Sequence, residues 1–323
     1  MNPAGRTPIT RWLVVVVAVV SMALMAGCSG STSDDNADRS STGTASSTRS
    51  GQPSGSSTTS TPTDPGTCTT VTACPKLPTP SAEVMKSGVT DSNADTAVPA
   101  YLTGLFNDLD QTWGGWFGEL DWGSPDPGRK LIEPGTTFRT ECIDDESEAQ
   151  IPSNLANAFF CPVDVAPNGS GQPTKGTVVL PVQTFQKIWQ GNVFGVPSPF
   201  VGDFTAAIVV AHEYGHNIVY RIADVLDIPE SQEPRGNNSE LIADCLAGNW
   251  AATVFQRDAL SPRDILQVAA LLPIIGDPGP NQGHGTITER ARALTVGLTG
   301  PQLNRQGQPV DCLSRYWPEK FGS

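Results

Sequence analysis

The segment "VVAHEYGHNIV" places two histidines four residues apart, in a chain of 323 residues that has only three histidines. On a helix, His212 and His216 project from one face a turn apart, and Glu213 lies close enough to reach the same cavity. Two neutral imidazoles at this spacing can bind one zinc ion, and the carboxylate can act on a neighbouring water molecule. The segment therefore predicts a helix that carries part of a metal site.

The residues around these histidines predict a long buried helix over residues 203–225, because its apolar residues surround it almost completely. Asp203 is the expected N-cap. The alternative is a core helix without a metal site, in which both histidines form hydrogen bonds with other protein groups. Burying two imidazoles and a carboxylate without partners is costly, however, and a metal ion would satisfy all three, so we favour the metal site.

A catalytic zinc ion needs a third protein ligand and an open position. The metzincin pattern would place glycine and histidine three and six residues after the second histidine, but Val219 and Ile222 stand there. That class is excluded. The weaker candidates for the third ligand are the acidic residues just downstream, Asp224, Asp227, Glu230 and Glu233.

The segment "SELIADCLAGNWAATVFQRD", residues 239–258, predicts a second helix with Ser239 as its N-cap. Glu240 in its first turn is the preferred third ligand, and Asp244, four residues on, is placed to accept an imidazole N–H. The alternative for Glu240 is a charge that only favours the amino end of the helix. Small residues, Ala243 among them, would let this helix approach the first one closely.

The third histidine, His284, stands between two glycines, just before a predicted helix over residues 286–298 that Thr286 can cap. An imidazole in such a loop can face a cleft and stabilise a developing oxyanion, which is the role that we favour. Two other roles stay open: a surface histidine, or the third zinc ligand in place of Glu240.

Residues 1–28 are typical of a secretory signal peptide. Arg6 and Arg11 precede an apolar stretch of about fifteen residues, shorter than the roughly 20 that a spanning helix needs. The exit "LMAGC" resembles a bacterial lipobox, which predicts cleavage before Cys28 and attachment of a lipid such as palmitate to it. The alternative is an ordinary signal peptide. We expect an extracytoplasmic protein, lipid-anchored to the outer face of the bacterial cell membrane.

Residues 29–66 are rich in Ser, Thr, Gly and Pro and contain almost no apolar residue. They cannot bury enough surface to offset their chain entropy, which predicts a disordered tether. Residues 67–323 then form one folded domain of single-core size. The formal net charge of −13 at pH 7 argues against a nucleic acid partner, because phosphate backbones select basic patches.

Six cysteines follow Cys28, and an even number behind an export signal predicts disulfides. Many pairings are open to six cysteines, and sequence spacing suggests Cys68–Cys74, Cys142–Cys161 and Cys245–Cys312. A zinc–thiolate site is the competing interpretation, but the chain contains no C-x-x-C pair.

The remaining segments predict an α+β fold. The run "GTVVLPV", residues 176–182, indicates a strand of a small upstream sheet that edges the cleft above the two-histidine helix. Helices over residues 262–275 and 286–298 complete a mostly helical C-terminal half. Residues 101–117 predict an amphipathic helix whose inward side chains belong to the core; these are Leu102, Leu105, Phe106, Leu109 and Trp113.

Three motifs in order, "HEYGH", "ELIADCLAGNW" and "HGTITER", resemble those of the bacterial putative neutral zinc metallopeptidases, over about residues 95–315. The upstream stretches "FFCPVD" and "VVLPVQTF" are also similar to that family. The resemblance implies a zincin-like fold and one catalytic zinc ion, with the ExxxD arrangement of gluzincin-type enzymes. The residues that it implies are His212, His216 and Glu240 as ligands, Glu213 as general base and Asp244 as partner of a liganding histidine.

The resemblance implies a peptidase that acts on peptides or proteins outside the cytoplasm, and it supports the pairs Cys142–Cys161 and Cys245–Cys312. His284 matches a family histidine, and we expect it, or Tyr214 or Tyr220, to hold the oxyanion. Tyr214 is the more natural core residue of the two tyrosines.

Two residues depart from the family pattern "HExGHHVQ", namely Asn217 and Val219. Neither residue is expected to bind the metal, but with these substitutions the family pattern no longer indicates how polar the cleft is. The alternative function is a zinc-binding, non-hydrolytic envelope lipoprotein that serves as a binding or scaffold module. The intact Glu213 argues against it, because a degenerate enzyme could lose that residue freely. A purely structural protein would leave Glu240, Asp244 and His284 unexplained.

Overall fold

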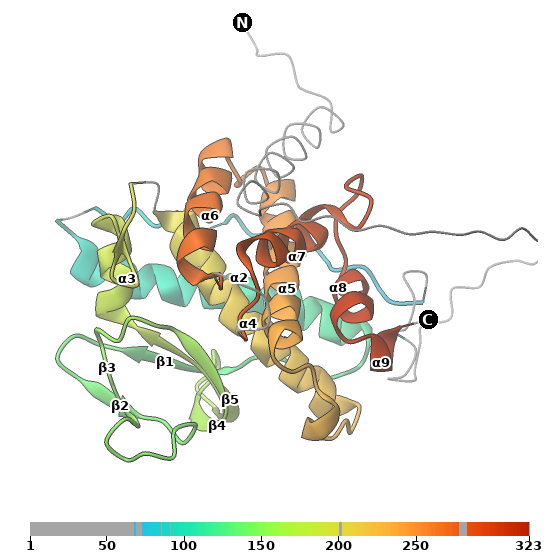
Figure 1. The fold of residues 1–323 in the computed structure, drawn as a ribbon, viewed down its shortest axis with the longest axis horizontal. Coiled ribbons are helices and arrows are strands. Elements are labelled where there is room, and N and C mark those ends of the chain that lie inside the picture. The colour runs from blue at the N-terminus through green and yellow to red at the C-terminus, as the bar shows by residue number, and fades with distance from the viewer. Residues whose placement is uncertain are drawn as a thin grey trace, which may run out of the picture.

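The computed structural model describes residues 68, 73–84, 86–90, 92–199, 202–277 and 283–322. They form an α+β domain with the strands gathered on one side and the C-terminal helices on the other (Figure 1). The expected signal peptide with Cys28 and the expected tether over residues 29–66 lie outside the described residues. None of the described helices combines the length and the apolar character that crossing a bilayer requires.

The main sheet has three strands in the order β1 (Gly128–Ile132), β5 (Pro173–Pro181) and β4 (Phe159–Pro167). β5 pairs in parallel with β1 and antiparallel with β4. The predicted strand "GTVVLPV" is thus the central one, and its apolar run is buried on both faces. The edge strand, β4, is the one that reaches the cleft, as described below.

Two further pairs of short strands complete the β structure. They are β2 (Thr137–Arg139) with β3 (Gln150–Pro152), and β6 (Asn192–Val193) with β7 (Val196–Pro197). Both pairs are antiparallel. The second pair forms a hairpin that follows helix α3 (Val182–Trp189) and ends shortly before the two-histidine helix.

The two-histidine helix is α4 (Asp203–Val225), with the predicted bounds, but its predicted cap is wrong. Gly202 occupies the N-cap position, and no side chain caps the helix. Asp203 is the first helical residue, and its carboxylate instead accepts hydrogen bonds from the Ser87 hydroxyl and, at 2.8 Å, from Trp189 Nε1. The Asp203 carboxylate therefore makes tertiary hydrogen bonds and does not cap the helix.

The second predicted helix is α5 (Asn237–Gln256), which begins two residues before the predicted cap. Gly236, with a φ of 54°, stands at the N-cap, so Ser239 lies inside the first turn and the prediction that it caps the helix is wrong. Glycine adopts this left-handed conformation without the steric cost that a side chain would add. Glu240 remains in the first turn, as predicted.

Helices α4 and α5 cross in close contact at Gly215, the glycine of the "HEYGH" motif. A Cβ atom added there would lie 2.9 Å from the carbonyl oxygen of Ala243 and 3.0 Å from its Cα atom. Such distances are too short for any side chain. The small residues on both helices therefore permit the approach that brings Glu240 to the histidines, as predicted for the small residues of the second helix.

The other helices surround this pair, and the described part of the chain also has one 3₁₀ turn, Glu230–Gln232. α2 (Ala94–Glu119) is longer than predicted at both ends, and its five predicted core side chains are buried. The C-terminal helices are α6 (Pro262–Ile275), α7 (Ile287–Thr299), α8 (Pro309–Tyr316) and α9 (Pro318–Phe321). Thr286 caps α7, as predicted, because its hydroxyl accepts from the backbone N–H of Glu289.

The structure contains the three disulfides that the sequence spacing suggested, Cys68–Cys74, Cys142–Cys161 and Cys245–Cys312. The third joins α5 to α8 across a sequence separation of 67 residues. A cross-link restricts the unfolded chain more strongly when it closes a longer loop, so this disulfide should contribute about 4 kcal/mol to stability and the shortest one about 2 kcal/mol.

We therefore expect the double substitution Cys245→Ala and Cys312→Ala to lower the melting temperature by about 8–16 °C, which corresponds to about 4 kcal/mol in a domain of this size. Calorimetry of the purified protein would measure it. The control is the pair Cys68→Ala and Cys74→Ala, whose sequence separation is 6. Equal losses of stability from both pairs would contradict the explanation by loop length.

Candidate metal centre

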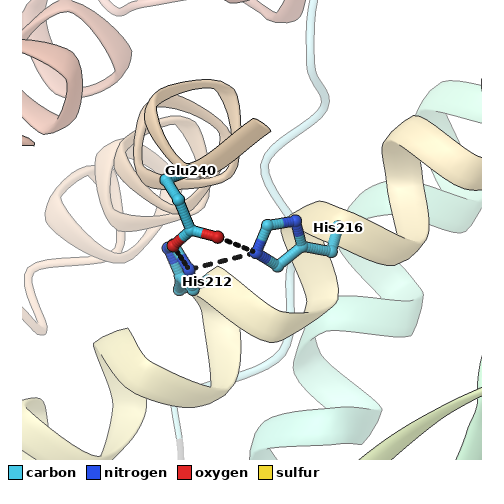
Figure 2. A group of neighbouring side chains, drawn as sticks. All are labelled: His212, His216 and Glu240. Carbon is cyan, nitrogen blue, oxygen red and sulfur yellow. Dashed lines mark hydrogen bonds and ion pairs between the residues drawn. The ribbon is translucent and has the colours of Figure 1, made fainter. Parts of the chain in front are cut away.

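Figure 2 shows His212 and His216 of α4 facing Glu240 of α5. The two Nε2 atoms lie 3.2 Å apart. One carboxylate oxygen of Glu240 lies 3.3 Å from His212 Nε2, and the other lies 3.5 Å from His216 Nε2. Among the described residues, these three side chains form the group of histidine and carboxylate ligands that could hold a metal ion.

The spacing of these atoms is suitable for zinc. In a tetrahedral site with ligands 2.0–2.1 Å from the metal, neighbouring ligand atoms are separated by about 3.3 Å. The measured separations are 3.2, 3.3 and 3.5 Å. Two imidazole nitrogens and one carboxylate are also donor types that zinc accepts, and three protein ligands leave a position open. The residues present therefore fit a catalytic type of zinc site.

Asp244 orients the first histidine. Its Oδ1 atom lies 2.9 Å from His212 Nδ1, so the ring donates its Nδ1–H to the carboxylate. In the neutral form of the ring, which is the form that binds a metal, this hydrogen bond places the proton on Nδ1 and leaves Nε2 free to face His216 and Glu240. The one-turn spacing of Glu240 and Asp244 places both carboxylates against the same imidazole, as the sequence predicts.

Arg290 of α7 completes this arrangement, and sequence reasoning missed its role, although the residue stands at the end of "HGTITER". Its Nε and Nη2 atoms donate to the two oxygens of Asp244, both at 2.8 Å, and Nη1 donates to the Ile275 carbonyl oxygen at 2.8 Å. Arg290 is only 3% exposed. A buried bidentate pair of this kind fixes both the position and the charge of the carboxylate.

The electrostatics of the centre favour ionised carboxylates. Burial lowers the pKa of His212, but the adjacent Asp244 carboxylate outweighs it and raises that pKa to about 10. Burial, followed by the charge of His212, lowers the pKa of His216 to about 4. Burial raises the pKa of Glu240, but its contact with His212 lowers it to about 2. A bound metal ion would take the place of the proton that His212 carries, because ligands must be deprotonated to bind a metal.

Glu213 lies beside these ligands but outside the ligand group. Its side chain lines the cleft and is otherwise buried, and burial raises the pKa of its carboxyl group to about 7. The backbone of Phe160, on the edge strand β4, partly offsets this rise in pKa. A carboxyl group with a pKa near neutrality is suited to general base chemistry at physiological pH.

His284 lines the same cleft, but the ligand group does not include it. Its side chain is 65% exposed and its Nδ1 lies 3.3 Å from Asp277 Oδ1. The other oxygen of Asp277 accepts the backbone N–H groups of His284 and Gly285, at 2.9 and 3.0 Å. Asp277 therefore holds the glycine-flanked loop at the cleft, and the sequence contained no signal for this role. The acidic residues considered as rival ligands also lie outside the ligand group, namely Asp224, Asp227, Glu230 and Glu233.

Tyr214 faces the core, since it is fully buried and its hydroxyl donates to Asp110 Oδ1 at 2.9 Å. Tyr220 lines the cleft, where its ring packs against Phe160 with 5.7 Å between centroids. Of the two tyrosines, Tyr220 is thus the one that lies on the cleft.

The two departures from the family pattern have different positions. Asn217 is fully buried and donates to the Pro125 carbonyl oxygen at 2.6 Å, so it belongs to the packing of α4 and not to the cleft. Val219 lines the cleft and adds an apolar surface to it. The question of cleft polarity therefore concerns Val219 alone.

Comparison with known proteins identifies one family and several relatives that the chain resembles. A family model described as "Putative neutral zinc metallopeptidase" matches residues 64–289. Uncharacterized protein Rv2575 of Mycobacterium tuberculosis and Uncharacterized protein Mb2605 of Mycobacterium bovis are each 29% identical over 169 residues, which is 45% of this chain and 52% of each relative. The chain thus spans about half the length of the curated relatives it matches. No solved structure matches it.

Proposed function

The chain belongs to the putative neutral zinc metallopeptidase family, and from this membership we propose that it is a zinc-dependent peptidase that hydrolyses peptide bonds outside the cytoplasm. The observation that carries the proposal is the convergence of His212, His216 and Glu240 at separations suited to zinc, with Glu213 beside them in a cleft. The export signal and the lipobox at Cys28 support an anchored, extracytoplasmic location, and the three disulfides suit an oxidising compartment.

The two histidines and Glu240 would hold the zinc ion, which when bound supplies a Lewis acid that activates water and polarises a carbonyl group. Asp244 keeps the His212 ring in the tautomer that binds a metal through Nε2. Arg290 neutralises the charge of Asp244 and holds its carboxylate in place.

Glu213 is the proposed general base. It takes a proton from the attacking water, whose oxygen bonds to the carbonyl carbon, and passes this proton to the nitrogen of the breaking C–N bond, so that the amine leaves neutral. His284, on the loop that Asp277 holds at the cleft, is the proposed group that stabilises the carbonyl oxygen as it becomes negative.

Zinc content is the measurement that tests the site. The purified protein should hold one zinc ion per chain, and Glu240→Ala should bind zinc about 100-fold more weakly, because losing a ligand costs at least as much as losing a hydrogen-bond partner of a ligand. Glu230→Ala is the matched control, since Glu230 is an exposed glutamate outside the ligand group.

Hydrolysis of a mixture of unrelated peptides, abolished by a chelator and restored by zinc, would complete the test. Folded protein that binds no zinc would contradict the proposed site. Protein that binds zinc but cleaves no peptide would favour the alternative of a zinc-binding module without hydrolytic activity.

A further inference from the structure

Two cavities meet at the candidate metal centre. The first has a volume of about 440 Å³ and the second about 390 Å³. They share a boundary formed by five residues, Asn157, His212, Glu213, Glu240 and His284. The cleft therefore continues past the centre in both directions, and a peptide chain can extend on both sides of a bond held there.

The first cavity, here called the apolar cavity, lies between α4, α6 and α7, of which α6 packs against α4 (Figure 1). The polar side chains of its wall lie at the metal centre and around Asp244 and Asp277, and the rest of the wall is an aliphatic floor, which includes Ile208, Val209, Val268, Leu271, Leu272 and Ile275. All of these except Ile275 are buried, so they form a fixed floor and not a loose surface. Its volume is within the range of roughly 300–1,000 Å³ typical of ligand pockets.

Away from the metal centre, the charged side chains of this cavity are already paired. Asp244 is bound by Arg290 and His212, and Asp277 is bound by the His284 loop. A polar or charged side chain entering the cavity would lose its water and find no free partner of opposite charge on the apolar floor. An aliphatic or aromatic side chain would lose only unfavourable contact with water.

The second cavity, here called the polar cavity, has a different lining on the other side of the centre. It includes Glu233, Ser239 and the ring of Tyr220. These polar groups stand beside the rings of Phe159 and Phe160, and the leucine and isoleucine side chains that form the floor of the first cavity are absent from its lining. The stronger selection for large apolar side chains is therefore expected on the side of the aliphatic floor.

We propose that the apolar cavity binds the side chain of a large aliphatic or aromatic residue, such as leucine or phenylalanine, that flanks the scissile bond of a peptide substrate. This inference rests on the proposed peptidase function and adds the substrate class. The contact of the apolar cavity with His212, Glu213 and Glu240 places its occupant beside the reacting bond.

Two valines of α4 provide a matched pair for the test. Val209 stands three residues before His212 and lines the apolar cavity, whereas Val219 stands three residues after His216 and lines the polar cavity. Both are 7% exposed. The same substitution at each position adds the same volume next to the same centre, on opposite sides.

The experiment uses peptides blocked at both ends that differ at one position flanking the scissile bond, where they carry leucine, phenylalanine, alanine or aspartate. Mass spectrometry identifies the bond that is cut. For the wild type we expect kcat/KM to be about 10- to 100-fold higher with leucine or phenylalanine than with alanine, from the apolar area buried. Val209→Phe should remove most of this preference, and Val219→Phe should keep it.

Val209→Ala provides a second variant if Val209→Phe does not fold, and it should shift the preference toward phenylalanine. Binding of the same peptides to the zinc-loaded Glu213→Gln variant, measured by calorimetry, should follow the same order without hydrolysis. Equal rates for the leucine and alanine peptides in active wild type would overturn the inference and leave the peptidase function standing.

If no peptide is cleaved although zinc is bound, the proposed peptidase function fails. The substrate preference of the apolar cavity is then tested by peptide binding alone. Tighter binding of the leucine peptide than of the alanine peptide, lost in Val209→Phe and kept in Val219→Phe, would support the apolar cavity. Equal binding of the two peptides would overturn it.

Discussion

Glu213→Gln is expected to lower kcat for peptide hydrolysis by about 10²- to 10⁴-fold while the protein keeps its zinc. The glutamine side chain has nearly the same shape, so the packing of α4 is retained. It cannot accept a proton from water, however, and the amine would have to leave without one. Steady-state kinetics together with the zinc content of the same preparation would measure the effect.

The control for this substitution is Glu230→Gln, which changes an exposed glutamate outside the ligand group and should keep both hydrolysis and zinc. Retained hydrolysis in Glu213→Gln would contradict the proposed mechanism. Loss of zinc from this variant would indicate instead that Glu213 takes part in holding the metal, although it lies outside the ligand group.

The parts of the site that could be predicted from the sequence are those set by short-range helix geometry. His212 and His216 share a face because they are four residues apart, and the same spacing relates Glu240 to Asp244. The small residues at Gly215 and Ala243 also indicate where two helices can approach each other. These local rules identify the two histidines and the two carboxylates of the site, but not the arginine that holds Asp244.

The caps of α4 and α5 show where local rules fail. Asp203 and Ser239 are good capping residues by type, yet neither caps its helix. The Asp203 carboxylate is engaged by Trp189, and Gly236 begins α5 earlier than the hydroxyl of Ser239 would require. A tertiary contact decided the first case and a neighbouring glycine decided the second, and capping preference by residue type predicts neither.

Arg290, Asp277 and the apolar cavity could not be predicted for a related reason. The roles of the two charged residues depend on how α7 and the loop before it pack against α5 and α6, which no spacing along the chain reveals. The leucines of α6 were predicted to be helical, but a residue that lines a cleft has the same sequence pattern as one that fills a core. Only the arrangement in space separates these two uses of apolar side chains.

Arg290→Met is expected to lower the free energy of unfolding by about 3–5 kcal/mol, because it leaves the buried carboxylate of Asp244 without its ionic partner. It should also weaken zinc binding by about 10- to 100-fold, since Asp244 would no longer be held against His212. Thermal unfolding and zinc titration with a competing chelator would measure the two effects. Arg290→Lys, which keeps the charge but not the two parallel hydrogen bonds, should give an intermediate loss of both.

Arg257→Met separates the two effects, because Arg257 forms a second buried pair, with Asp108, at the C-terminal end of α5, whereas Glu240 lies in the first turn of that helix. We expect it to reduce stability by a similar amount and to leave zinc affinity unchanged. The double variant Asp244→Leu with Arg290→Met removes the uncompensated charge and should regain stability, but not zinc affinity, because His212 then has no acceptor for Nδ1–H. If zinc affinity returns with stability in that variant, Arg290 and Asp244 support only the fold and not the metal centre.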